Sequence, residues 1–345
     1  MSKKFWFVGL SLLPAAALVV GGLHVRRDLL NRKAARNVSI AKSKWEAAKG
    51  VQLTFNEPLD AVTWSVNGRT STIRFMKPAT SVWLKTSFPQ GKKSTIKVRS
   101  VETTYKQHIA ENWRLSDILP ASMKVVTNPG PWQLNVPRKG PYTVQFSAPI
   151  QNRTKATQDI SFAPNISGKW VWENADTAAF YPAHEVAPAA QEKMLINSGK
   201  TGPISTSGQY LSTSVTRNFI TASNEKIVVR EKLPETLTLY KNGKAIFHSL
   251  CNTAVKGAHT PLGQFYIRTK YLHVDMKGVN PNGTHYNDPN VPWVMGLIGS
   301  IAIHGFPRAS YGFPQSNGCV ELPVKIAKKL YSMVKVGTPV EITKS

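Results

Sequence analysis

The chain has 345 residues, of which 41% are hydrophobic and 18% charged, so it can bury ordinary cores and is not a disordered chain. Its 44 Lys and Arg exceed 19 Asp and Glu, and the net charge of +25 favours polyanionic surroundings such as nucleic acid, anionic lipid or an acidic cell wall. The two cysteines exclude a disulfide-dense scaffold, and no spacing of Cys with His or carboxylates matches a structural zinc site. We therefore expect neither a metal nor a cofactor, and two or three domains.

An uncharged apolar segment lies at the N-terminus. Residues 5–23 follow Lys3 and Lys4 and run for 19 residues without a charge, which is long enough for a helix to cross about 30 Å of hydrocarbon. We expect residues 1–23 to be an N-terminal transmembrane helix that anchors the chain to the cell membrane in a single pass. A cleaved signal peptide ending near residues 15–17 is the alternative, although the apolar run continues past them.

Residues 24–49 carry eight Lys or Arg and few large apolar residues, so we predict a basic stalk that attracts anionic membrane lipid. An ordinary exposed helix is an equal alternative. Positive charge after the apolar segment would by itself place the C-terminal side in the cytoplasm.

Residues 50–222 have the texture of short strands. Alternating stretches rich in Val, Ile, Thr, Trp and Phe are separated by turn signals such as Asn67-Gly68. The segments VQLTFNEPL (51–59) and YTVQFSAPI (142–150) share an alternating pattern offset by 91 residues, about the size of one immunoglobulin-like domain. The second copy resembles bacterial immunoglobulin-like modules. We therefore predict two immunoglobulin-like β-sandwich domains, residues 50–122 and 123–222, in which Trp170 and Trp172 pack as core or sheet-face aromatics.

A third domain, residues 223–345, is predicted to be rich in β-strands with few helices. Asn242-Gly243 separates two strand-like runs and predicts a type I′ hairpin turn. Residues 324–334 place apolar side chains on one face of a helix that follows Pro323, and residues 338–342 predict a closing strand.

Two segments of this domain carry reactive groups. GSIAIHGF (299–306) places His304 at the end of an apolar strand, and QSNGCVELP (315–323) places Cys319 fifteen residues later. A cysteine nucleophile needs a base within hydrogen-bond reach, because the thiolate is the attacking species. The Ser316-Asn317-Gly318 turn can supply backbone donors for an oxyanion, and the nearby helix N-terminus is expected to favour the thiolate.

These residues resemble a family. TPLGQF (260–265), the VPWVM to IAIHG run (291–305), SNGC (316–319) and GTPVEI (337–342) follow the order and spacing of L,D-transpeptidase (YkuD-like) catalytic domains, over about residues 226–345. The resemblance implies that Cys319 attacks the carbonyl before the terminal D-alanine of a peptidoglycan tetrapeptide stem. His304 would move the proton, and an amine of a neighbouring stem would resolve the thioester into a 3→3 cross-link.

The resemblance also implies roles for neighbouring residues. The N–H groups of Gly318 and Cys319 are candidates for the oxyanion hole, and Ser316 and Gly305 would hold His304 and the loop. Two positions depart from the common pattern of the family. Asn317 stands where many members have His, and Glu321 stands where many have Arg or Asn. We expect both to affect substrate binding, and a carboxylate at 321 to favour an amine-bearing substrate.

Tyr286 and Trp293 lie in a segment that in the family borders the active-site flap, so both are candidate substrate-binding residues. Core packing is an equal interpretation for Trp293. Residues 270–292 are long and rich in turn residues for a connection, which favours a lid or binding loop. Cys251 is predicted to be structural.

Other functions remain open at this point. Transfer to water would be L,D-carboxypeptidase activity, and a catalytically silent protein could tether anionic wall polymers through its β-domains and positive charge. No nucleic-acid-binding motif is present, so nucleic acid is not an expected partner. Because peptidoglycan lies outside the cytoplasm, we expect the catalytic domain to be extracytoplasmic and to face the cell wall, in conflict with the charge count after residue 23.

Overall fold

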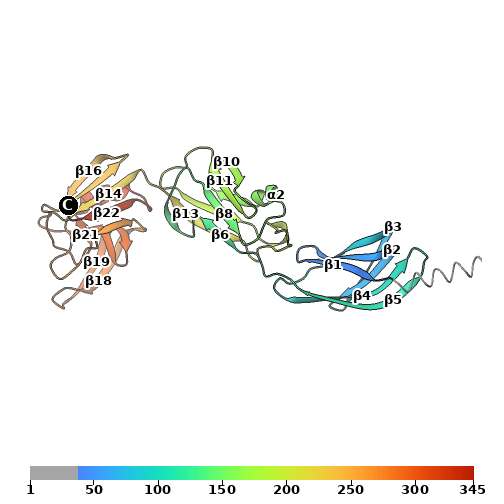
Figure 1. Ribbon diagram of the computed structural model, residues 1–345. Helices are drawn as coiled ribbons and strands as arrows, with labels where there is room; N and C mark the ends of the chain where they lie inside the picture. The colour runs from blue at the N-terminus through green and yellow to red at the C-terminus, as the bar shows by residue number, and fades with distance from the viewer. Residues whose placement is uncertain (1–37) are drawn as a thin grey trace, which may run out of the picture. The chain divides into compact units, whose positions relative to one another are not determined.

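The computed structural model describes residues 38–345 (Figure 1). The chain divides into two compact units, one that ends at Ser122 and also contains Ile204–Tyr210, and one that comprises Met123–Pro203 and Leu211–Ser345. The predicted transmembrane helix, residues 1–23, and the first part of the basic stalk lie outside the described residues. Within residues 38–345, the chain forms no helix that is long and apolar enough to cross a membrane.

The first unit is built on one antiparallel sheet of five strands. β2 pairs with β1, β3 and β4, and β5 pairs with β4. Its strands are β1 (Ile40–Glu46), β2 (Gly50–Val66), β3 (Arg69–Lys85), β4 (Lys93–Thr103) and β5 (His108–Ile118). The immunoglobulin-like class predicted for residues 50–122 stays a prediction, as the strands of this unit are joined in one hydrogen-bonded sheet.

The strand β2 contains a proline. Pro58 lies inside this 17-residue strand where the register shifts between Thr54 and Leu59. A proline is tolerated in a strand at such a bulge, so the strand bends and continues instead of ending. The turn comes at Asn67 and Gly68, whose φ angles of 49° and 82° fit the type I′ turn that this pair favours.

The boundary of the predicted basic stalk is wrong. β1 starts at Ile40 and pairs with β2 from Ile40 to Glu46, inside the range 24–49 assigned to the stalk. The Trp45 ring packs 5.1 Å from that of Phe88, and Ala47 is buried. The lysines of β1 lie at exposed positions of an edge strand, which hid its alternation.

A segment from farther along the chain completes the first unit. The side chain of Gln90 accepts a hydrogen bond from the backbone N–H of Tyr210 at 2.9 Å and donates to its carbonyl at 3.2 Å. Ile204–Tyr210 therefore belongs to this unit by its contacts, although we predicted it within the second β-domain, residues 123–222.

The second β-domain is a sandwich of two four-stranded sheets, in the orders β10-β11-β8-β6 and β7-β13-β12-β9. The elements are β6 (Val125–Asn128), β7 (Gln133–Val136), β8 (Tyr142–Phe146), α2 (Arg153–Gln158), β9 (Ile160–Ala163), β10 (Gly168–Trp172), β11 (Thr177–Pro182), β12 (Gln191–Ile196), η1 (Gly199–Thr201) and β13 (Val215–Thr221). Tyr142 of one sheet packs edge-on against Phe219 of the other, with ring centroids 5.3 Å apart. Trp170 and Trp172 stack on Phe162 and Phe146, which confirms their predicted packing role. The immunoglobulin-like class of this sandwich stays a prediction.

The C-terminal domain contains two sheets and one helix. The sheets have the orders β16-β15-β14-β22-β17 and β18-β19-β20-β21. The elements are β14 (Glu225–Arg230), β15 (Thr236–Lys241), β16 (Lys244–Leu250), β17 (Gly263–Tyr266), β18 (Thr269–Val279), β19 (His285–Ile298), β20 (Ile301–Gly305), β21 (Val320–Leu322), α3 (Val324–Met333) and β22 (Pro339–Thr343). The predicted hairpin turn at Asn242-Gly243, the helix and the closing strand are confirmed.

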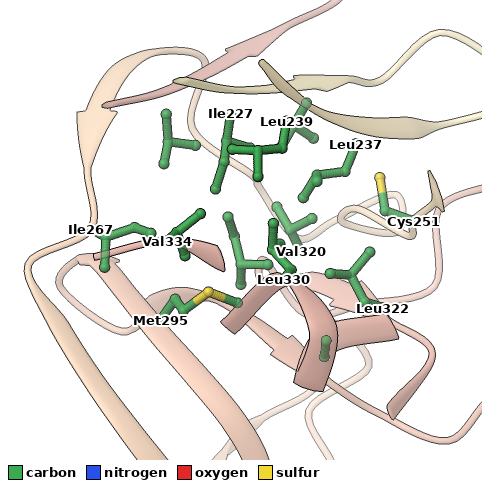
Figure 2. Packing of buried hydrophobic residues seen from close by; sticks show 14 of the residues in the cluster. Ile227, Leu237, Leu239, Cys251, Ile267, Met295, Val320, Leu322, Leu330 and Val334 are labelled. Atoms are coloured by element: carbon green, nitrogen blue, oxygen red, sulfur yellow. The ribbon is translucent and has the colours of Figure 1, made fainter. Parts of the chain in front are cut away.

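The core of this domain lies between the two sheets and the helix. Figure 2 shows Ile227 and Leu239 of the five-stranded sheet pointing toward Val320 of β21 and Leu330 of α3. All four side chains are fully buried. The core thus fixes β21, which directly follows Cys319, against the body of the domain.

Residues 270–292 do not form the predicted lid loop. β18 and β19 pair as a long antiparallel hairpin, from Thr269 opposite Gly296 to Val279 opposite His285. The turn residues of the sequence gather in the short connection 280–284, where Asn280 and Thr284 hydrogen-bond to each other. The segment is therefore a two-stranded arm whose tip carries Asn280.

Candidate active site

Cys319 and His304 are brought together by a parallel strand pair. His304 lies near the end of β20, and Cys319 immediately precedes β21, whose Val320 pairs with Ile303. Both residues line one cleft of about 340 Å³. The two residues, fifteen positions apart in the sequence, thus line the same cleft, where the Cys319 thiol donates to the Ser300 carbonyl oxygen at 3.5 Å.

Cys319 is half-buried, and its thiol is protonated at neutral pH. Burial raises the pKa of the Cys319 thiol to about 11; the N–H of Ala302 lowers it in part, and the charge of Glu321 raises it further. The expectation that the helix N-terminus favours the thiolate is therefore wrong. β21 and Pro323 lie between Cys319 and the first turn of α3, and the effect of a helix terminus falls off within about one turn.

His304 is 3% exposed and oriented by its own backbone neighbour. Its Nδ1 lies 3.1 Å from the Gly305 carbonyl oxygen, which can only accept, so Nδ1 carries the proton and Nε2 is unprotonated in the neutral ring. Burial lowers the pKa of His304 below its usual value. The resting site therefore holds a neutral thiol and a neutral imidazole that can accept a proton.

Ser316 holds the loop that carries the cysteine. Its buried hydroxyl donates to the Cys319 carbonyl at 2.5 Å and accepts from the Gly318 N–H at 3.1 Å. The Gly318 N–H, a predicted oxyanion donor, bonds the Ser316 hydroxyl in this structure, and its role toward an oxyanion stays a prediction. Within residues 38–345 no acceptor binds the Cys319 N–H, which remains a candidate donor. Ser316 has no contact with His304 among its hydrogen bonds, so the orienting group is Gly305 alone.

The glycine at 318 has a steric reason. Its φ is +133°, and a Cβ there would lie 2.9 Å from Ile301 Cδ1 and 3.1 Å from the His259 carbonyl oxygen. Both the backbone conformation and the lack of space require glycine. Gly305 is similarly enclosed, since a Cβ would lie 3.2 Å from both Ala327 and Val324 of α3.

The two positions that depart from the family pattern have partners within the protein. Asn317 is exposed and donates from Nδ2 to Asn280 Oδ1 at 2.7 Å, so it joins the catalytic loop to the tip of the β18–β19 arm. Glu321 is 4% exposed, and its two oxygens accept from Nε and Nη2 of Arg308, both at 2.8 Å. Glu321 lines the cleft, but both of its oxygens bind Arg308; its predicted contact with the substrate stays a prediction.

Tyr286 and Trp293 have different positions. Tyr286 lines the cleft and lies flat on Gly278, where a Cβ would come within 2.7 Å of its ring. Burial raises the pKa of Tyr286, and the neighbouring Cys319 adds to this. Trp293 does not line the cleft. Its ring packs edge-on against Tyr331 of α3 with centroids 5.5 Å apart, so the core interpretation holds.

The sequence reasoning missed several cleft residues, among them Tyr271, Asp288, Phe306 and Arg308. A signal for two of these four was present. His304, Phe306 and Arg308 stand at alternating positions, and in an extended chain such residues point to one side. The other two come from the β18–β19 arm, which was taken for a loop.

A half-buried thiol and a neutral, oriented imidazole in one cleft are the two groups that a cysteine-dependent acyl-transfer enzyme requires. Residues 224–342 match the family model of the L,D-transpeptidase catalytic domain, YkuD. The solved structure of the catalytic domain of an L,D-transpeptidase from E. faecium is 30% identical to this chain. The match covers 34% of this chain and 95% of the E. faecium domain, with a TM-score of 0.31. Through this domain the chain belongs to the L,D-transpeptidase (YkuD) family.

Other solved structures match over a longer part of the chain. An L,D-transpeptidase from Mycobacterium smegmatis is 21% identical and covers 64% of this chain and 99% of that chain, with a TM-score of 0.35. One from Mycobacterium tuberculosis H37Rv is 20% identical and covers 64% and 97%, with a TM-score of 0.33. No curated protein matches the chain at a significant level.

Proposed function

We propose that this protein forms 3→3 cross-links in peptidoglycan through an acyl-enzyme on Cys319. The single observation that supports this most strongly is that the neutral thiol of Cys319 and the neutral imidazole of His304 line one cleft. A thiol with a pKa of about 11 cannot supply thiolate by itself at neutral pH, so it needs this base at the moment of attack.

In the first half-reaction, Sγ attacks the carbonyl carbon of the third stem residue as His304 Nε2 takes the thiol proton. The Cys319 N–H stabilises the oxyanion of the tetrahedral intermediate. The C–N bond to the terminal D-alanine then breaks, and His304 gives its proton to the departing amine. The products are a thioester and free D-alanine.

In the second half-reaction, an amine of a neighbouring stem attacks the thioester carbonyl. His304 takes a proton from this amine and returns it to the departing sulfur, so that the thiol is restored and a new amide bond is formed. Water in place of the amine gives L,D-carboxypeptidase activity, which is the alternative outcome of the same acyl-enzyme. A protein that only tethers wall polymers would form no acyl-enzyme.

The site of action follows from the substrate. We propose that the chain is held at the cell membrane by residues 1–23 with the catalytic domain on the extracytoplasmic side, where peptidoglycan stem peptides lie. The net charge of +25 supports an association with anionic wall polymers or membrane lipid.

The test is to incubate the full chain with a disaccharide tetrapeptide and to analyse the products by mass spectrometry. We expect dimers that have lost one D-alanine, and no product from Cys319→Ala. Cys251→Ala is the matched control: Cys251 is fully buried and lies outside the cleft, so this variant should retain activity. Free tripeptide without dimers would indicate the carboxypeptidase. The absence of any product from folded protein would contradict the proposal.

A further inference from the structure

Arg308 lies in the cleft that holds Cys319, and one nitrogen of its guanidinium group, Nη1, is left for a ligand. Its Nε and Nη2 donate to the Glu321 carboxylate, and Nη2 also donates to the Gln315 carbonyl at 3.0 Å. Within residues 38–345 no acceptor binds Nη1. A guanidinium has five N–H donors, so the two on Nη1 remain available to a ligand in the cleft that also holds Cys319.

The position of this guanidinium is fixed by the protein. Glu321 is buried beneath it, and its Cζ lies 4.7 Å from the centroid of the Phe306 ring. Phe306 in turn packs edge-on against His304, with ring centroids 6.0 Å apart. A ligand bound by Arg308 is therefore held at a defined place relative to the base, with little loss of side-chain freedom on binding.

The donors on Nη1 determine which kind of ligand can bind. This nitrogen presents only donors, and the side chain of Arg308 is 30% exposed while that of Glu321 is 6% exposed, so the positive partner faces the cleft. The two N–H groups of Nη1 can donate charge-assisted hydrogen bonds to a carboxylate, and such bonds are stronger than neutral ones. The hydrogen bonds to Glu321 raise the pKa of Arg308, and the charge of Asp288, which also lines the cleft, adds to this. Because Asp288 repels an anion, a ligand carboxylate has to be held by direct hydrogen bonds from Nη1.

We infer that Arg308 binds the free carboxylate of the amino acid that leaves in the first half-reaction, so that the enzyme selects stems ending in a free carboxylate. This rests on the proposed function, since the leaving D-alanine carries its carboxylate one carbon from the nitrogen of the scissile bond. Arg308 is then a specificity-determining residue of the cleft.

The experiment compares two tetrapeptide substrates on the full chain, one ending in D-alanine and one in D-alaninamide. We expect kcat/KM to be about 10- to 100-fold lower for the amide, the range for a charge-assisted hydrogen bond. In the double variant Arg308→Gln/Glu321→Gln, which removes both charges together, the ratio should fall below about threefold. Lys277→Gln removes a different cation that lines the cleft and should keep the wild-type ratio. If the double variant fails to fold, Arg308→Lys, which keeps a cation opposite Glu321, should still lose most of the discrimination.

Equal kcat/KM values for the two substrates on the wild type, or an unchanged ratio in a folded Arg308 variant, would overturn the inference. Equilibrium binding of both peptides to the Cys319→Ala chain distinguishes a failure of the Arg308 inference from a failure of the proposed function. If neither peptide acylates the wild type, the proposed function fails. The inference still stands if the carboxylate peptide binds Cys319→Ala at least about tenfold more tightly than the amide in an Arg308-dependent way, and it falls if the two bind equally.

Discussion

The ion pair of Arg308 and Glu321 should be strongly cooperative. Arg308→Gln leaves a carboxylate that is 4% exposed without its two charge-assisted hydrogen bonds. Each such bond contributes about 1.5–3 kcal/mol, and removal of one partner of a buried pair costs about 3–5 kcal/mol. Glu321→Gln should cost less, about 1–2 kcal/mol, because the guanidinium that remains reaches solvent. The double variant should be more stable than Arg308→Gln alone.

Native-state hydrogen exchange is the suitable assay, because a chain with several domains does not unfold in two states. The opening free energy of amides in β20 and β21 is compared for the wild type, both single variants and the double variant. Lys226→Gln is the matched control: its pair with Glu341 is also short, 2.6 Å, but both side chains are about a third or more exposed, so we expect a loss below about 1 kcal/mol. The reasoning is refuted if Arg308→Gln lowers the opening free energy no more than Lys226→Gln does. It is also refuted if the losses of the Arg308→Gln and Glu321→Gln single variants sum to the loss of the double variant.

Three further predictions concern the site. Because burial lowers the pKa of His304, the unfolded chain binds a proton at this residue more readily than the folded chain does. The domain should therefore lose stability as pH falls below about 6.5. In thermal melts, the melting temperature of His304→Gln should fall less between about pH 7 and pH 5 than that of the wild type. Ser316→Ala leaves the Gly318 N–H and the Cys319 carbonyl without their partner; we expect a loss of about 1–3 kcal/mol by hydrogen exchange and slower acylation, and unchanged acylation would contradict the loop-holding role. Asn317→Ala removes the exposed hydrogen bond to Asn280 and keeps the Asn280–Thr284 bond, so exchange should accelerate at residues 280–284 with a stability loss below about 1.5 kcal/mol. Unaltered exchange there would show that the bond does not restrain the arm.

The local patterns of the sequence predicted much of the C-terminal domain. The turn at Asn242-Gly243, the helix after Pro323 and the shared cleft of His304 and Cys319 depend on short-range signals: a turn that needs positive φ, a helical period and a strand end. The ionisation of Cys319 could not be predicted this way. It depends on how much solvent the folded domain removes, and here burial outweighs the helix.

Hydrogen-bond partners that come from distant segments of the chain could also not be predicted from the sequence. Glu321 and Asn317 were read as groups that face the substrate because nothing nearby in the chain suggested otherwise. Arg308 reaches Glu321 across thirteen positions, and Asn280 reaches Asn317 across thirty-seven. In the first β-domain, the bulge that accommodates Pro58 becomes visible only when β2 is paired with its neighbours.

The central claim is that Cys319 carries the acyl group, and intact-mass spectrometry of the full chain quenched in acid during turnover tests it most directly. The account predicts that incubation with a tetrapeptide increases the protein mass by that of the tripeptide acyl group, and that peptide mapping places this increase on Cys319. Cys319→Ala should show no increase in mass. Dimers or free D-alanine formed at the wild-type rate by Cys319→Ala, or an adduct mapped to another residue, would contradict it.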